Sequence, residues 1–151
     1  MPQSLAQVYL HIVFSTKDRY PWLGTKQLQA DTHAYISSTL NNLDCPCLIT
    51  GGVADHVHTL CRFGRTLSIA DLVRDIKRSS SRMLGDRGGV LKGFHWQSGY
   101  GAFSISPSHV EGLRAYIRNQ EEHHRRESFQ DEYRRLLKKY GLEFDEQYVW
   151  D

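Results

Sequence analysis

Alternating apolar and polar positions predict the strands of one sheet. Residues 8–14 (VYLHIVF) place apolar side chains on both faces, which is typical of a central strand. Residues 56–63 alternate in the same way, and a shorter apolar segment at 47–50 ends at two glycines. Residues 94–98 and 102–106 are also expected to be extended, with a glycine-containing kink, bulge or turn between them.

Apolar residues at helical spacing predict four helices between and after these strands. The first spans about 25–42, and the second follows Ser68, whose hydroxyl can cap it. The third begins at Ser106-Pro107, with proline at the first helical position. The last opens at Ser128 and carries one apolar face.

The order of these elements predicts the fold class. A β-α-β-β-α-β order followed by a helical pair is typical of an α+β, ferredoxin-like split βαβ fold: an antiparallel sheet with helices mainly on one face. We expect residues 1–151 to form a single domain, with 127–151 as a C-terminal helix and an acidic, aromatic tail that docks on the surface.

Composition narrows the class of protein further. The chain has 151 residues, a net charge of +2 and three cysteines. It has no apolar run near the ~20 residues of a membrane helix and no secretory signal pattern. Three cysteines are too few for a disulfide framework, and without a second Cys-x-x-Cys pair they favour buried thiols over a zinc site. We therefore expect a soluble cytoplasmic protein without a membrane partner.

The segment His56-Val57-His58 is the first candidate for chemistry. On a strand, residues two apart project to the same face, so both imidazoles point the same way. Two neutral imidazoles side by side can bind one divalent ion and leave positions open for substrate. Taken alone, such a pair is more often part of an exposed polar face than a metal site.

A second candidate lies on the predicted third helix. Tyr116 and Gln120 are four residues apart, so they lie one turn from each other at the edge of the apolar stripe. His123 continues that edge. Each residue alone has an ordinary structural explanation, but a His-x-His strand and a Tyr-x-x-x-Gln helix in one small domain favour a shared site.

The chain resembles the single-tyrosine transposases of the HUH nuclease superfamily, which include the insertion-sequence-200-like and REP-associated tyrosine transposases. The resemblance covers about residues 7–150, and the motifs occur in the same order. Five segments carry it: 11–17 (HIVFSTK), 51–58 (GGVADHVH), 76–80 (IKRSS), 94–101 (FHWQSGYG) and 116–120 (YIRNQ).

The resemblance implies a metal-dependent cleavage of DNA. His56, His58 and Gln120 correspond to the ligands of a divalent ion, Mg²⁺ or Mn²⁺, with His123 and His124 as alternatives to Gln120. Tyr116 corresponds to the nucleophile, which forms a 5′-phosphotyrosine link and releases a 3′-hydroxyl. That link conserves the energy of the broken bond, so rejoining needs no nucleotide cofactor and the absence of a P-loop is no objection.

The resemblance further implies a substrate and a partner. The substrate is single-stranded DNA beside a hairpin, and the protein is a homodimer in which the tyrosine helix of one subunit completes the metal site of the other. Eight basic and three acidic residues lie between 62 and 92, which suits a polyanion. The candidate DNA-binding residues are Lys17, Arg19, Arg62, Arg65, Arg74, Lys77, Arg78 and Arg82.

Two other functions compete with the transposase. The first is a domesticated protein, derived from a transposase, that binds DNA hairpins without cleaving them. The intact Tyr116 argues against it. A ferredoxin-like RNA-binding domain is the second, and it leaves the histidine and tyrosine motifs unexplained. Of the nearby residues, His11 is expected to be a hydrogen-bonded core histidine and Asp55 to face away from the histidine pair.

Overall fold

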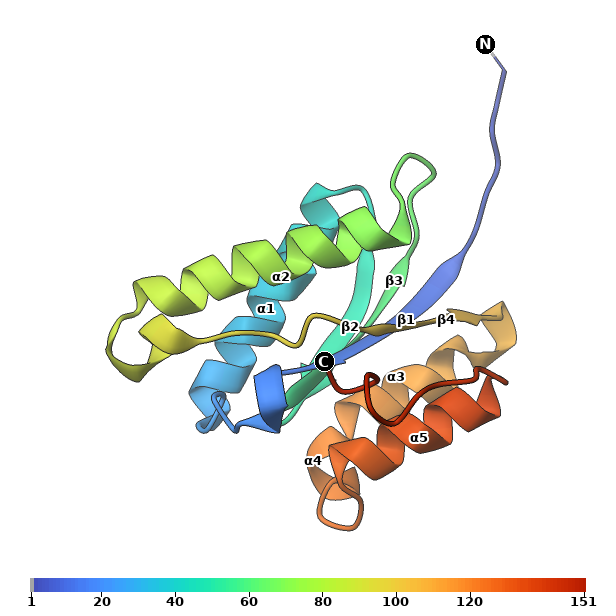
Figure 1. Ribbon diagram of the computed structural model, residues 1–151. Coiled ribbons are helices and arrows are strands. Elements are labelled where there is room, and N and C mark those ends of the chain that lie inside the picture. Colours follow the sequence, from blue (N-terminus) through green and yellow to red (C-terminus); the bar gives the residue numbers. More distant parts are fainter. Residues whose placement is uncertain (1) are drawn as a thin grey trace.

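A four-stranded antiparallel sheet forms the centre of the protein in the computed structural model, which describes residues 2–151 (Figure 1). The strand order is β2-β3-β1-β4, and all three pairings are antiparallel. This order is that of the split βαβ arrangement, so the predicted α+β fold class is confirmed. The strands are β1 (Tyr9–Ser15), β2 (Cys47–Gly52), β3 (His56–Arg62) and β4 (Gly101–Ile105).

The two long helices, α1 (Lys26–Asn42) and α2 (Ile69–Asp86), cover one face of the sheet (Figure 1). The hydroxyls of Thr25 and Ser68 accept hydrogen bonds from the first turns of these helices, as N-caps do. Alternate residues of β1 face this layer, because successive side chains of a strand point to opposite faces. The buried cluster on this face includes Leu10, Ile12, Phe14, Ile36, Leu40, Leu72 and Ile76.

Three C-terminal helices cover the other face: α3 (Val110–Arg118), α4 (Gln120–His123) and α5 (Phe129–Lys139). Val13 and Phe103 pack against α5, while Leu60 of β3 packs against Ile117 of α3. The expectation that helices lie mainly on one face holds for α1 and α2 of the split βαβ. The C-terminal helices add a second layer, so the sheet is buried on both sides.

Residues 94–98, expected to be extended, do not form a strand. Only Trp96 forms a β-bridge, to Thr16, after a short 3₁₀ turn at Gly89–Gly93. On each side of this bridge the backbone pairs with the end of β1: Lys17 N–H donates to the His95 carbonyl and Gln97 N–H donates to the Ser15 carbonyl, both at 2.9 Å. Lys77 Nζ donates to the carbonyl oxygens of residues 97, 98 and 99, at 2.7, 3.1 and 2.7 Å. Between the Trp96–Thr16 bridge and the first β4 pair, Gly101 with Val13, the chain bulges away from β1, so the ladder of β4 begins only at Gly101.

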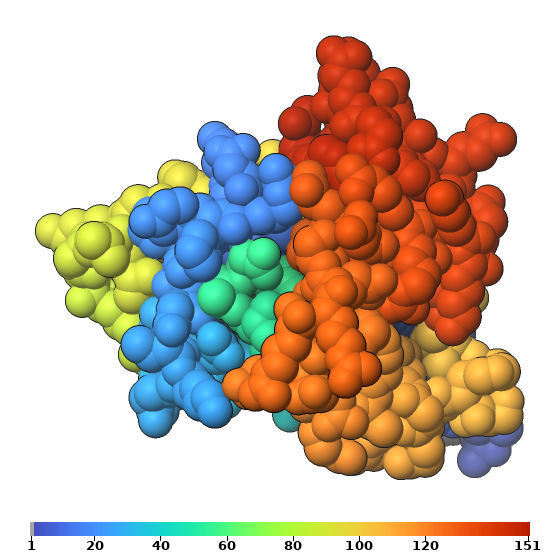
Figure 2. Space-filling view, turned by 90° about the horizontal axis from the view of Figure 1, so that it is seen from below, coloured from blue at the N-terminus to red at the C-terminus, as the bar shows by residue number. Residues whose placement is uncertain are grey.

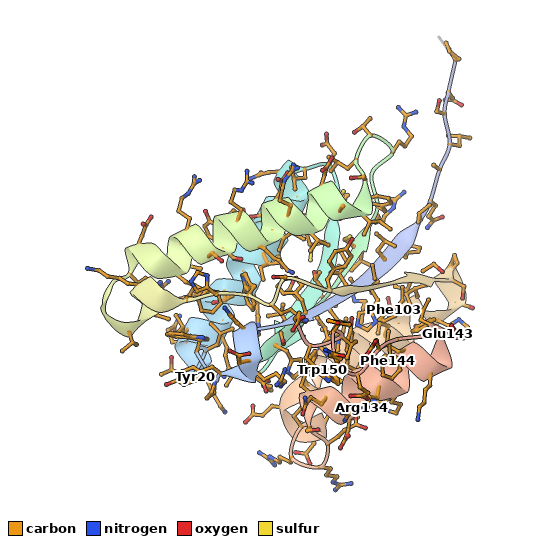
Figure 3. All side chains as sticks on the ribbon, in the orientation of Figure 1. Tyr20, Phe103, Arg134, Glu143, Phe144 and Trp150 are labelled. Carbon is orange, nitrogen blue, oxygen red and sulfur yellow. The ribbon has the colours of Figure 1, made fainter. Side chains whose placement is uncertain are left out.

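The acidic, aromatic tail docks on α5, as expected (Figure 3). Glu146 accepts two hydrogen bonds from Arg134, at 2.6 and 3.0 Å. Trp150 lies under the same guanidinium, with 5.0 Å between the guanidinium carbon and the ring centroid. Phe144 also packs against the α5 cluster. Among residues 2–151, no helix has the length and apolar character needed to cross a bilayer.

Candidate active site

The two histidines of β3 lie at the centre of a buried polar cluster. His56 and His58 are fully buried, on the sheet face that the C-terminal helices cover. Their Nε2 atoms lie 3.4 and 2.8 Å from the same oxygen, Oε1 of Glu132. The strand therefore aims both imidazoles at one point, as its two-residue period requires.

The other ring nitrogens of the two histidines are held by neighbouring side chains. His56 Nδ1 lies 2.7 Å from Oδ1 of Asp55, and His58 Nδ1 lies 2.8 Å from Nε2 of His11. His11 is thus the hydrogen-bonded core histidine that was expected. The expectation that Asp55 faces away was wrong, because Asp55 lies in a bend before β3, where strand alternation does not apply.

Glu132 of α5 is the central residue of the cluster, and sequence reasoning missed it. Its side chain is fully buried, and a buried carboxylate needs several partners. Oε1 faces the histidines, while Oε2 accepts hydrogen bonds from the Tyr116 hydroxyl and from Gln120 Nε2, the latter at 3.2 Å. The available signal was its position within the apolar stripe of α5, between Phe129 and Leu136.

Tyr116 of α3 points its hydroxyl into the same cluster. Besides Glu132, the oxygen lies 3.2 Å from His123 Nε2 and accepts a hydrogen bond of 2.8 Å from Arg135 Nη2. The Tyr116 and His58 rings meet edge to face, with centroids 5.9 Å apart. The phenol and the imidazole pair, 58 residues apart in sequence, therefore meet within one chain.

Gln120 also reaches the cluster, although not on a continuous helix. The predicted third helix breaks at Asn119, and Gln120 is the first residue of α4. Its Oε1 lies 3.0 Å from His56 Nε2, and its side chain is buried. The predicted proximity of Tyr116 and Gln120 thus survives the interruption of the helix at Asn119.

Charge in the cluster is set by burial and by close pairing. Burial lowers the pKa of His56, but its contacts with Asp55 and Glu132 outweigh burial and raise it to about 9. Burial lowers the pKa of His58 despite the nearby carboxylate. Burial also raises the pKa of Tyr116, and the negative charge of Glu132 adds to this effect. The phenol is therefore neutral in this state.

The donor set fits a divalent metal ion. One nitrogen each from His56, His58 and His124 and one oxygen of Glu132 all lie within 4.8 Å of one another. His124 Nε2 is buried without a hydrogen-bond partner, although it lies 3.1 Å from Oε1 of Glu132. An unpartnered buried nitrogen beside a carboxylate and two imidazoles is a chemically suitable ligand position. Gln120 Oε1 adds a further oxygen donor at the same point.

Four of the candidate DNA-binding residues lie on α2, on the face of the sheet opposite Tyr116 (Figure 1). Arg74 pairs with Asp71 and Asp75, at 3.0 and 3.1 Å. Lys77 is turned inward to the carbonyls of residues 97–99, so it is a structural residue. Within residues 2–151, Arg78 and Arg82 are exposed and form no ion pair. These two remain available to a polyanion.

The other four candidates lie away from α2. Lys17 and Arg19 belong to a 3₁₀ turn after β1, where Arg19 lies over the Trp150 ring at 5.6 Å. Arg62 and Arg65 are exposed at the end of β3 opposite to the one that carries the histidine pair. None of the eight touches the cluster, whereas Arg135, which was not anticipated, bonds to the Tyr116 hydroxyl.

Comparison with known proteins decides the family. The family model of IS200-like transposases matches residues 4–120, which include the histidine pair, Tyr116 and Gln120. This chain belongs to the IS200-like transposases. The match ends before α5, so Glu132 and Arg135 of the transposase lie outside it.

Two solved structures share the fold of the transposase at low sequence identity. One, from Deinococcus radiodurans R1 and assigned as a transposase, has a TM-score of 0.62 and 18% identity, covering 80% of this chain and 95% of that one. The other, a REP-associated tyrosine transposase bound to a REP hairpin, has a TM-score of 0.60 and 16% identity, covering 82% and 73%. No curated protein matches the chain in sequence.

Proposed function

We propose that this transposase nicks and rejoins single-stranded DNA beside hairpins through a 5′-phosphotyrosine at Tyr116, as a metal-dependent enzyme of the HUH type. The observation that carries the proposal is the contact of the Tyr116 hydroxyl with the carboxylate that also faces His56 and His58. The hairpin substrate is supported by the structural neighbour described as bound to a REP hairpin.

The cofactor we propose is Mg²⁺ or Mn²⁺, held by His56, His58 and Glu132 with His124 or Gln120. When bound, such an ion polarises the scissile phosphate and offsets the charge that develops on its oxygens. Asp55 and His11 bind the outer nitrogens of the two histidines and hold the rings in the orientation that ligation requires.

The chain's own residues account for the remaining steps. The Tyr116 oxygen attacks phosphorus, and its proton passes to Oε2 of Glu132, with which it is already hydrogen-bonded. The bond from phosphorus to the 3′-oxygen breaks, and that oxygen leaves as a hydroxyl after taking a proton from water. Arg135 donates a hydrogen bond to the phenol oxygen of Tyr116. Its guanidinium is therefore placed to pair with the negative charge of the phosphate that becomes bonded to this oxygen.

Homodimerisation remains a prediction of the family resemblance. In the chain described here, the nucleophile and the histidines come from one subunit. The composite site that the resemblance implies, in which the tyrosine helix of one subunit completes the metal site of the other, also remains a prediction.

The deciding experiment is a covalent-adduct assay. We expect the protein, with Mg²⁺ or Mn²⁺ and single strands carrying the hairpins that flank its gene, to form a protein–DNA adduct resistant to denaturation. Tyr116→Phe should abolish the adduct and retain hairpin binding, whereas Tyr35→Phe, at an exposed tyrosine of α1, should behave as the parent protein. An adduct formed by Tyr116→Phe would overturn the assignment of the nucleophile.

The metal assignment has its own test. His56→Ala should lose both metal dependence and cleavage while hairpin binding persists, because the imidazole faces the cluster and not the surface. Full cleavage by His56→Ala would contradict the proposed metal site.

A further inference from the structure

A cleft opens beside Tyr116, between β4, α3 and α5, and the chemistry described so far does not use it. Its volume is about 660 Å³, within the range typical of ligand sites and larger than one nucleoside needs. Tyr116 and Arg135 lie at the end that adjoins the cluster. Figure 2 shows the orange residues of α3 and α4 beside the red residues of α5, on the side of the molecule where these helices meet.

The walls of the cleft are apolar and its rim is cationic. Ile105, Leu113 and Tyr140 contribute apolar and aromatic surface, and Lys139 of α5 contributes positive charge. Arg135 also lines the cleft, with its guanidinium 3.0 Å from the carboxylate of Glu127. Lys139 forms no ion pair within the described residues 2–151, so its charge is free to meet an anion. Apolar walls with a cationic rim suit a planar base that is joined to a phosphate.

His11 has a buried polar atom at the wall of the cleft that lacks a hydrogen-bond partner. The residue is fully buried, yet it lines the cleft, and its Nδ1 has no hydrogen-bond partner. Its other nitrogen is occupied by His58. Nδ1 is a donor in one tautomer and an acceptor in the other. A nucleobase edge carries both kinds of group and can satisfy either, whereas a phosphate offers only acceptors.

We propose that this cleft binds the nucleoside next to the scissile phosphate, with its base between the walls of α3 and β4 and one base edge on His11. The position follows from continuity, because Tyr116 is both the nucleophile and a lining residue of the cleft. The phosphate backbone of the DNA then runs out of the cleft along α5, where Arg135 and Lys139 contact it. The inference rests on the proposed function and adds to it a site that selects the base beside the cut.

Gly112 of α3 offers a way to fill the cleft without disturbing the fold. It lines the cleft, and a Cβ added there meets no atom within 4 Å. Gly112→Phe should therefore place a ring where the base binds. Ala115→Phe is the matched control, since Ala115 is an exposed residue of the same helix that does not line the cleft.

The first measurement is direct binding without cleavage. 2-Aminopurine is placed in turn at each unpaired position of the hairpin strands, and fluorescence is recorded with Tyr116→Phe protein in metal-free buffer. We expect one position to change its emission on binding, and this change to disappear when Gly112→Phe is added but to persist with Ala115→Phe. If no position responds, or if the response survives Gly112→Phe, the proposal is wrong.

The second measurement is adduct formation. An abasic residue at one position next to the cleaved phosphate should slow adduct formation by the parent protein at least about tenfold. Gly112→Phe should slow adduct formation on the intact strand to a similar extent. An abasic residue in the strand should slow adduct formation by this variant no further. If adducts form at the normal rate and no base affects that rate, the proposed role of the cleft is wrong and the proposed function stands. Absence of an adduct would instead refute the proposed function, and the fluorescence scan would still decide the cleft.

Discussion

The Tyr116 hydroxyl donates a hydrogen bond to Oε2 of Glu132, sixteen residues further along the chain. The other oxygen of the same carboxylate lies 2.8 Å from His58 Nε2 and 3.4 Å from His56 Nε2. One buried side chain of α5 thus joins the candidate nucleophile to the candidate metal ligands. The arrangement makes Glu132 the residue on which the geometry of the whole cluster depends.

Glu132→Gln should therefore reduce adduct formation at least about 100-fold while hairpin binding is unchanged. The amide keeps the size of the side chain but supplies neither the charge for the ion nor a proton acceptor for the phenol. Asp131→Asn makes the same change on the exposed side of α5 and should stay within about twofold of the parent. Equal rates for the two variants would remove Glu132 from the mechanism.

Manganese should support adduct formation at lower concentration than magnesium. His56, His58 and His124 offer three imidazoles, whereas Mg²⁺ prefers oxygen ligands and retains its waters. The measurement is a titration of each metal into chelator-treated protein, read by adduct yield. His124→Gln should narrow the difference between the two metals, and a site that used them at equal concentrations would contradict ligation by His124 in addition to His56 and His58.

Gly51→Ala should lower both stability and activity. A Cβ at Gly51 of β2 would lie 2.6 Å from the carbonyl oxygen of Ile117, the residue after Tyr116. The helix would have to move outward, at a cost of about 1–3 kcal/mol in the free energy of unfolding. Urea unfolding and adduct rates measure the two effects. Gly85→Ala, whose added Cβ meets only one atom at 4.0 Å, should preserve both.

The exposed arginines of α2 should contribute to non-specific DNA binding. Arg78→Ala with Arg82→Ala should reduce the slope of log affinity against log salt by about 0.7–0.9 per lost phosphate contact. Arg74→Ala should have a smaller effect, because its charge is shared with two aspartates. An unchanged slope in the double variant would place the DNA entirely on the face that carries Tyr116.

The thiol of Cys61 should resist alkylation in the folded protein. Burial raises the pKa of this thiol to about 12 from an ordinary value of 9.0, so it stays protonated at pH 8.5. Stability from this shift is fully present below pH 9 and is lost as the pH rises from 9 to 12. Iodoacetamide labelling followed by mass spectrometry should modify Cys61 only after unfolding. Rapid labelling of the native protein would contradict its burial.

Local patterns were sufficient for most of the fold. The alternation in β1 and β3 and the hydroxyl caps at Thr25 and Ser68 act between near neighbours in sequence, so they are readable from the chain itself. Residues 94–98 lie beside the end of β1, where Gln97 N–H donates to the Ser15 carbonyl at 2.9 Å, but a bulge before Gly101 separates them from the ladder of β4. The carbonyls at the bulge are bound by Lys77 of α2, and a contact with so distant a side chain leaves no periodic signal in the sequence.

The site divides in the same way. Two short motifs and a family resemblance predicted a shared site for His56, His58, Tyr116 and Gln120, and these side chains meet in the structure. Glu132 and Arg135 were missed because α5 looks like an ordinary amphipathic helix until it is packed on the sheet. Lys77 was assigned to DNA for a related reason: its charge is visible in the sequence, while its inward direction is not.

The sequence by itself determined the strand and helix types, the order of the elements and the identity of the imidazole pair and the phenol, because these depend on residue type and spacing. Only the tertiary structure decided that α5 crosses the second face of the sheet and inserts a carboxylate between them. Such a contact joins segments far apart along the chain, and a buried charge is tolerated there only because several distant partners converge on it.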